Sequence, residues 1–146
     1  MPRVDFYVLP DNSSAERFAC IIANKAWQQG HGVYVQTASP EAAGTMDDLL
    51  WTFNDICFLP HAVTGTDSVP TERVVIGWQD QLPGNYEVLI NLATDIPSAA
   101  DRFARIVEIV AGDQWQRDQA RNRYRRYRER GYELHNHTLE SVHDHT

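Results

Sequence analysis

The alternation of apolar and polar positions along the chain predicts strands that alternate with helices. Short apolar runs typical of buried strands occupy residues 4–9, 33–36, 56–59, 74–78 and 88–92. Helices are predicted over residues 14–29, 39–51, 98–111 and 114–130, and apolar residues recur at helical spacing in the first and third of them. Ser14 and Ser39 are favourable N-caps for the first two helices, and Gly30 is a typical residue at a helix end. Residues 62–73 are rich in Gly, Thr and Pro and are predicted to form a loop.

This order of elements predicts a single α/β domain with a mostly parallel sheet flanked by helices. A Rossmann-like sheet of this kind can bind a nucleotide at the turn after its first strand. The phosphate-binding motif is missing, because the chain has no GxxxxGK[ST] sequence and Gly30-His31-Gly32 precedes a strand. We therefore expect no cofactor. The domain is predicted to span residues 1–134, and a polar, histidine-rich tail, 135–146, is expected to be loose at its end.

Composition bears on whether the protein enters a membrane, is secreted or forms disulfides. No apolar run in the 146 residues approaches the roughly 18 needed to cross a membrane. The apolar run near the N-terminus is too short for the core of a signal peptide. Cys20 and Cys57 lack a CxxC spacing and are expected to be reduced, buried thiols. A cytoplasmic protein without a membrane partner is the interpretation that these features favour.

Charge is distributed unevenly along the chain. The net charge is −7, yet residues 117–130 hold seven of the 13 basic residues and only two acids. This segment is therefore +5 and the rest of the chain −12. An acidic body repels a long polyphosphate, so a basic strip on it favours a specific anionic partner over DNA.

The last predicted helix arranges its arginines in a stripe. At 3.6 residues per turn Arg117, Arg121, Tyr124 and Arg128 share one face, with Arg125 beside them. The small Ala120 is expected to leave a hollow between the arginines. Such a face can hold a carboxylate bidentately while the hollow accepts an apolar side chain. The alternative is a solvated basic face, although like charges four residues apart repel each other by a few tenths of a kcal/mol.

Other candidate groups point to no chemistry. The aromatic residues Trp51, Phe53 and Phe58 surround a helix–strand junction, where they are either core or, if exposed together, a protein-binding patch. His61 has no visible nucleophile or acid arranged with it. The histidines of the tail lack a rigid carboxylate or thiolate neighbour, so no metal site is expected. We find no catalytic constellation and expect no enzymatic activity.

Several stretches together resemble one known family. They are Val4-Asp5-Phe6-Tyr7-Val8-Leu9, Leu50-Trp51, Phe58-Leu59-Pro60-His61, Glu87-Val88-Leu89-Ile90-Asn91-Leu92, and Arg121-Asn122-Arg123-Tyr124-Arg125-Arg126-Tyr127-Arg128 with Gly131-Tyr132. In this order and spacing they resemble the chi subunit of bacterial DNA polymerase III. The resemblance implies an α/β fold related to nucleotide-binding domains but without their chemistry, and no catalysis.

The resemblance also implies partners and the residues that contact them. Members of this family join the psi subunit in the clamp-loader assembly and bind the acidic C-terminal tail of single-stranded DNA-binding protein, which ends in Pro-Phe. Tail-binding positions of the family fall on Val110, Arg117, Arg121, Tyr124 and Arg128, and the phase of the helix adds Arg125.

For psi, the family's contact positions fall on Trp51 and Phe58. A repair helicase is an alternative partner for that surface. Arg123, Arg126 and Arg130 are expected to be bystanders, and the histidine-rich end is given no role. Contact with nucleic acid is then indirect, and the competing hypothesis is a module that binds single-stranded nucleic acid directly through the same arginines.

Overall fold

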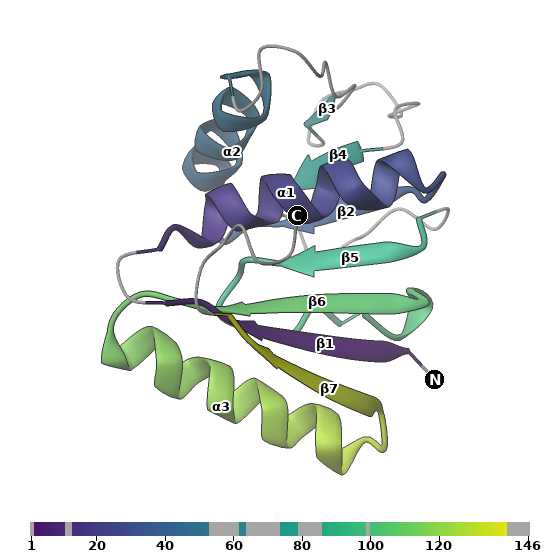
Figure 1. The fold of residues 1–146 in the computed structure, drawn as a ribbon, viewed down its shortest axis with the longest axis vertical. Coiled ribbons are helices and arrows are strands. Elements are labelled where there is room, and N and C mark those ends of the chain that lie inside the picture. The colour runs from purple at the N-terminus through teal and green to yellow at the C-terminus, as the bar shows by residue number, and fades with distance from the viewer. Residues whose placement is uncertain are drawn as a thin grey trace.

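The computed structural model describes residues 2–10, 13–52, 62–63, 74–78, 86–98 and 100–139. Within these residues the fold is a seven-stranded sheet in the order β3-β4-β2-β5-β6-β1-β7, and every neighbouring pair is parallel (Figure 1). The strands are β1 (Arg3–Val8), β2 (Val33–Gln36), β3 (Ala62–Val63), β4 (Val74–Gly77), β5 (Val88–Asn91), β6 (Arg105–Val110) and β7 (Glu133–Thr138). The helices are α1 (Ala15–Gln28), α2 (Pro40–Thr52), α3 (Gln114–Glu129) and a short 3-10 helix, η1 (Ala100–Arg102).

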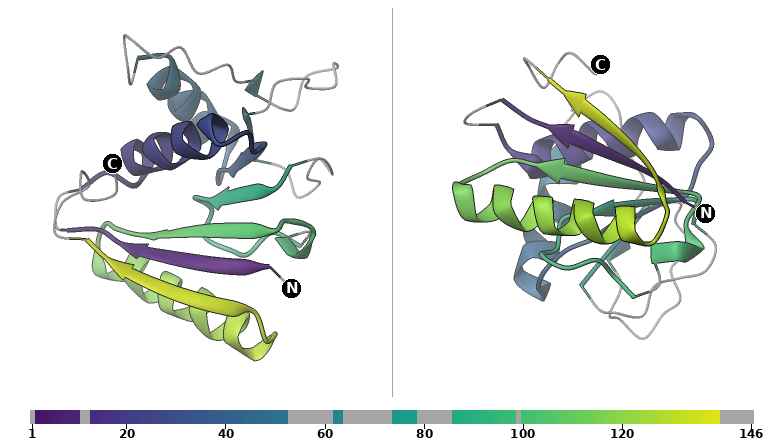
Figure 2. Two further views of the ribbon diagram at one scale, coloured as in Figure 1. Left: turned by 45° about the vertical axis from the view of Figure 1, so that its right-hand side comes forward. Right: turned by 90° about the horizontal axis from the view of Figure 1, so that it is seen from below.

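Helices cover both faces of the sheet, and each face has its own hydrophobic core (Figure 2). Side chains of α1 and α2, such as Phe18 and Met46, pack on one face against Tyr7 and other strand residues. On the opposite face Tyr127 of α3 packs with Phe6. Successive side chains of a strand point to opposite faces, so adjacent residues such as Phe6 and Tyr7 belong to different cores. This arrangement confirms the predicted α/β fold with a parallel sheet flanked by helices.

The expected signals at the helix ends are present in the structure. Ser14 caps α1 by accepting a hydrogen bond from the backbone N–H of Arg17, and Gly30 follows α1 with φ of 87°. At α2, the Ser39 hydroxyl accepts from the backbone N–H of Ala42 at 3.1 Å. Ser14 and Ser39 accept hydrogen bonds from backbone N–H groups that have no partner within the helix. Because such residues are typical of a helix start, both helices could be predicted from the sequence.

The prediction of a helix over residues 98–111 is wrong. Among the residues of this stretch that the structure describes, only those of η1 are helical, and Arg105–Val110 forms β6 between β5 and β1. Phe103, Ile106, Val107 and Val110 have helical spacing, but a strand covered on both faces also yields an unbroken apolar run. The β-branched residues of this run favour a strand, because their stiff side chains pack well on a pleated surface.

The polar sequence after Gly131 also forms an unexpected element. Residues Glu133–Thr138 make the edge strand β7, which runs parallel to β1 with His137 opposite Tyr7. The sheet therefore continues past residue 134, where the domain was expected to end. Ala62 and Val63 lie in the predicted loop but pair with β4. The strand predicted over residues 56–59, with Cys57, lies outside the described residues.

Candidate functional site

The start of α3 is fixed by a reciprocal pair of hydrogen bonds. The Asp113 carboxylate accepts from the backbone N–H of Gln116 at 2.9 Å, and the Gln116 side chain accepts from the backbone N–H of Asp113 at 3.1 Å. Gly112 precedes them with φ of 87°, and a Cβ at this residue would collide with the Gln116 side chain. This capping box sets where the helix begins and therefore which way its arginines face.

One side of α3 borders a groove of about 230 Å³, which we call the α3–β7 groove. Its lining residues come from four elements: Phe6 and Val8 of β1, Val110 of β6, Arg117, Ala120, Arg121 and Tyr124 of α3, and Asn136 of β7. Phe6, Val8, Val110 and Ala120 form an apolar floor. Polar groups at the rim come from Arg117, Arg121, Tyr124 and Asn136.

Contacts across the groove hold Tyr124 in place. Its ring packs edge-on against Phe6, with the ring centroids 5.1 Å apart. The Tyr124 hydroxyl accepts a hydrogen bond from the Asn136 side-chain amide at 3.3 Å. Arg121 is 71% exposed and lies 3.5 Å from the Asp118 carboxylate, while the Arg117 Nε donates to the carbonyl of Gly112 at 3.2 Å. Both guanidinium groups therefore stand at the edge of an apolar hollow.

The structure brings together four of the six residues expected to bind the tail. Val110, Arg117, Arg121 and Tyr124 line the α3–β7 groove, and Ala120 contributes to the hollow as the helical phase suggested. Arg125 and Arg128 are exposed on α3 and do not line it. Sequence reasoning missed three lining residues: Phe6, Val8 and Asn136. Phe6 and Val8 are more than 100 residues before α3 in the sequence, and Asn136 lies in a polar segment that gave no strand signal; the pairing of β1 with β7 brings all three to the groove.

Arg123 is not the bystander that the sequence suggested. It is 7% exposed, and its Nε donates to the buried carboxyl of Glu108 at 2.9 Å. The same carboxyl accepts from the Tyr127 hydroxyl at 2.7 Å and from the Asn91 amide at 2.9 Å. Burial raises the pKa of Glu108, and the charge of Arg123 opposes that rise. These bonds tie α3 to β5 and β6 and so position the groove.

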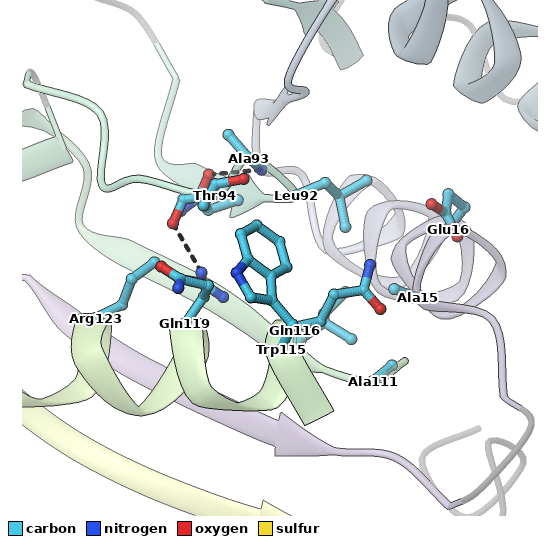
Figure 3. A pocket seen from close by; sticks show the side chains of 12 residues that line it. Ala15, Glu16, Leu92, Ala93, Thr94, Ala111, Trp115, Gln116, Gln119 and Arg123 are labelled. Carbon is cyan, nitrogen blue, oxygen red and sulfur yellow. Dashed lines mark hydrogen bonds between the residues drawn. The ribbon is translucent and has the colours of Figure 1, made fainter. Parts of the chain in front are cut away.

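A second hollow, of about 110 Å³, lies between the N-terminal ends of α1 and α3 (Figure 3). Its lining includes Leu92 and Thr94 after β5, Ala111 after β6, and Trp115 of α3. Figure 3 shows the Trp115 indole beside Leu92 and Thr94, and this residue is 59% exposed. Nucleotide-binding sheets place their ligands at the carboxyl ends of the strands, but here the sequence supplies no glycine-rich phosphate loop.

The remaining candidates are only partly described. Trp51 lies in α2, but its side chain and Phe58 are outside the described residues, as are His61 and the last histidines. His135 and His137 lie in β7 and bond to Glu133 and Asp5 at 2.9 Å each. Among the described side chains, no three from His, Cys, Asp and Glu gather in an arrangement that could hold a metal ion.

The fold and the groove define an α/β domain with a Rossmann-like parallel sheet and an arginine-rimmed groove beside its edge strand. The chain belongs to the DNA polymerase III chi subunit family: the model of "DNA polymerase III chi subunit, HolC" matches residues 1–135. It is 37% identical to the DNA polymerase III subunit chi of Pseudomonas aeruginosa over 145 residues, covering 97% of this chain and all of that protein. Its identity to the Escherichia coli subunit chi is 28%, covering 92% of this chain and 96% of that one. The family is one of replication subunits.

A solved structure shares the fold at low sequence identity. The crystal structure of T4 UvsW matches with a TM-score of 0.66 and 9% identity, covering 97% of this chain. The chain spans 42% of that structure, so the likeness concerns the fold alone. None of the helices in the described segments is long and apolar enough to cross a membrane.

Proposed function

We propose that this protein is a non-catalytic adaptor of the DNA polymerase III holoenzyme whose α3–β7 groove binds the acidic C-terminal tail of single-stranded DNA-binding protein. The observation that carries the proposal is the combination in one groove of an apolar floor with two guanidinium groups at its rim. A peptide ending in an aromatic residue with a free carboxylate presents the matching chemistry.

Each part of such a peptide has a counterpart in the groove. The terminal phenyl ring would rest on Phe6, Val8 and Val110, since burial of apolar surface drives its entry. Arg117 or Arg121 would take the terminal carboxylate in a charge-assisted, bidentate hydrogen bond. The exposed Arg125 and Arg128, further along the helix, would attract the aspartates that precede the end.

The psi subunit is the second partner in this proposal. Family membership supports it, and the contacts are assigned to Trp51 and Phe58 through the family's pattern alone. Binding at the two surfaces would link the clamp loader to single-stranded DNA coated by its binding protein. Where psi is absent, a repair helicase would take the Trp51 and Phe58 surface. In either case this chain contacts nucleic acid only indirectly.

Titration of the full chain with a labelled acidic peptide ending in Pro-Phe tests the groove. We expect micromolar affinity that falls roughly ten- to a hundredfold in Arg121→Ala, because a charge-assisted hydrogen bond contributes about 1.5–3 kcal/mol. Arg130→Ala is the matched control, since Arg130 is an exposed arginine at the far end of α3, outside the groove lining. Removing the peptide's last residue should weaken binding to the wild-type chain by a similar factor.

Two results would count against this function. If the shortened peptide binds as well as the intact one, the apolar floor has no role in recognition. If the chain ignores the peptide but binds a bare oligonucleotide with a steep dependence on salt, the direct nucleic-acid module is correct instead.

A further inference from the structure

The edge strand β7 forms one wall of the α3–β7 groove. Asn136 lines the groove from this strand, and its amide reaches across to the Tyr124 hydroxyl. Because side chains alternate along a strand, the neighbouring His137 points to the opposite face of the sheet. There it pairs with residues of β1 instead of groove residues. One face of β7, with Asn136, thus borders the groove, and we call it the groove side. The other face, with His137, contacts β1, and we call it the anchoring side.

The anchoring side is built from specific contacts. His137 Nε2 lies 2.9 Å from the carboxylate of Asp5, which is fully buried. The imidazole also stacks on Tyr7, with the ring centroids 4.6 Å apart and the planes at 18°. Asp5 in turn accepts hydrogen bonds from Arg3 at 3.1 Å and from Arg105 at 2.8 Å. β7 pairs with β1 over all six of its residues, and these side-chain contacts add to that pairing at the edge of the sheet.

The groove side offers a group that the arginines do not. A guanidinium donates hydrogen bonds but accepts none, whereas a side-chain amide does both. The main chain of a bound peptide carries both N–H donors and C=O acceptors, so an amide at the rim can pair with either. Asn136 is exposed, and its 3.3 Å bond to Tyr124 is long, so exchanging it for a bond to a ligand costs little.

We propose that Asn136 contacts the main chain of the bound acidic peptide and that His137, seated on Asp5 and Tyr7, is the positioning residue that keeps Asn136 at the groove. This inference rests on the proposed function of the groove. It assigns a role to two residues of the histidine-rich end, both beyond residue 135, where the match to the family model stops.

The test is a double-mutant cycle with the Pro-Phe peptide and the full chain. Asn136→Ala should weaken binding about three- to tenfold, the loss expected for one neutral hydrogen bond. His137→Ala should weaken it by a similar factor in the wild-type background but cause no further loss when Asn136 is already alanine. His137→Gln, whose amide can also donate to Asp5, should restore most of the affinity.

The control is His135→Ala, since His135 lies on the same strand and bonds to the exposed Glu133; it should bind as the wild type does. Thermal unfolding of each variant verifies that it is folded, and Asn136→Ser provides a second substitution at the exposed site. Wild-type affinity in Asn136→Ala, with a clear loss in Arg121→Ala, overturns the inference and leaves the proposed function standing. A His137→Ala loss that is equal in both backgrounds overturns the positioning role. Failure of the wild-type chain to bind any peptide overturns the proposed function and this inference with it.

Discussion

Arg121 and Arg123 lie two residues apart on α3 and have opposite environments. The Arg121 side chain is 71% exposed at the groove rim, and that of Arg123 is 8% exposed against Glu108. Two residues apart on a helix means about 200° of rotation, so consecutive odd positions face opposite sides. Glu108 itself lies in the middle of β6, where a carboxylate is tolerated because Arg123, Tyr127 and Asn91 all donate to it. Within one run of arginines, Arg123 therefore has a structural role, while Arg121 is a candidate for binding.

The first prediction concerns this buried pair. Replacing Arg123 with Leu leaves the Glu108 carboxylate buried without its cation, so the free energy of unfolding should fall by about 3–5 kcal/mol. Arg130→Leu, on the exposed end of the same helix, should change it by no more than about 0.5 kcal/mol. Urea titrations of the two variants and the wild type measure the difference. Equal stability of the two variants would show that the pair does not hold α3 on the sheet.

At the scale of elements, Asp5 joins three neighbouring strands. From β1 it bonds to Arg105 of β6 on one side and to His137 of β7 on the other. Burial alone would raise the pKa of Asp5, but the hydrogen bonds from His137, Arg105 and Arg3 outweigh it and hold the pKa below its ordinary value of 3.8. Asp5 is therefore ionised above this lowered pKa. Its carboxylate then links β1 to β6 and to the edge strand β7.

This pairing predicts how stability depends on pH. A carboxyl group with a lower pKa in the folded chain stabilises the fold above its unfolded pKa, and the contribution is lost as the pH falls through the folded value. Asp5→Asn should therefore be less stable than the wild type near pH 6, and the gap should narrow as the pH drops below 3.8. Urea unfolding of both proteins at about pH 6 and about pH 3 provides the measurement. A gap that is the same at both pH values would contradict the role assigned to the ionised carboxylate.

At the scale of the whole molecule, charge is separated between one helix and the rest. The segment 117–130 carries +5 on a chain of net charge −7. Arg123 uses its charge inside the core, while Arg121, Arg125 and Arg128 are exposed on the surface. An acidic peptide would be attracted to this strip, whereas a long nucleic acid would also be repelled by the acidic remainder of the chain.

Salt should therefore weaken peptide binding without abolishing its selectivity. Between about 0.1 M and about 1 M NaCl the Debye length falls from about 10 Å to about 3 Å, so attraction between the exposed arginines and the peptide's aspartates is largely screened. We expect roughly tenfold weaker binding of the Pro-Phe peptide at the higher concentration. The penalty for removing its terminal phenylalanine should persist, because burial of the ring does not depend on charge. Fluorescence anisotropy at both salt concentrations tests both statements, and loss of the phenylalanine effect at high salt would contradict the second.

The sequence by itself determined those features that depend on local geometry. Helical phase grouped Arg117, Arg121 and Tyr124 on one face, and side-chain caps at Ser14 and Ser39 located two helices. Both follow from contacts within one turn of helix, which are encoded by neighbouring residues. The alternation of strands and helices along the chain was likewise sufficient to predict the α/β class and the mostly parallel sheet.

Only the tertiary structure decided the strands β6 and β7 and the strand side of the groove, because these features depend on contacts between separate elements of the fold. Residues 105–110 have an apolar spacing compatible with a helix or a doubly buried strand, and their place between β5 and β1 selects the strand. The polar segment 133–138 forms the strand β7 because it pairs with β1 at the edge of the sheet and because His137 bonds to Asp5 and stacks on Tyr7. That pairing brings Asn136 opposite Tyr124 and completes the groove. A non-local contact of this kind leaves no periodic signal in a single sequence, so Phe6, Val8 and Asn136, three of the eight residues that line the groove, could be found only in the folded molecule.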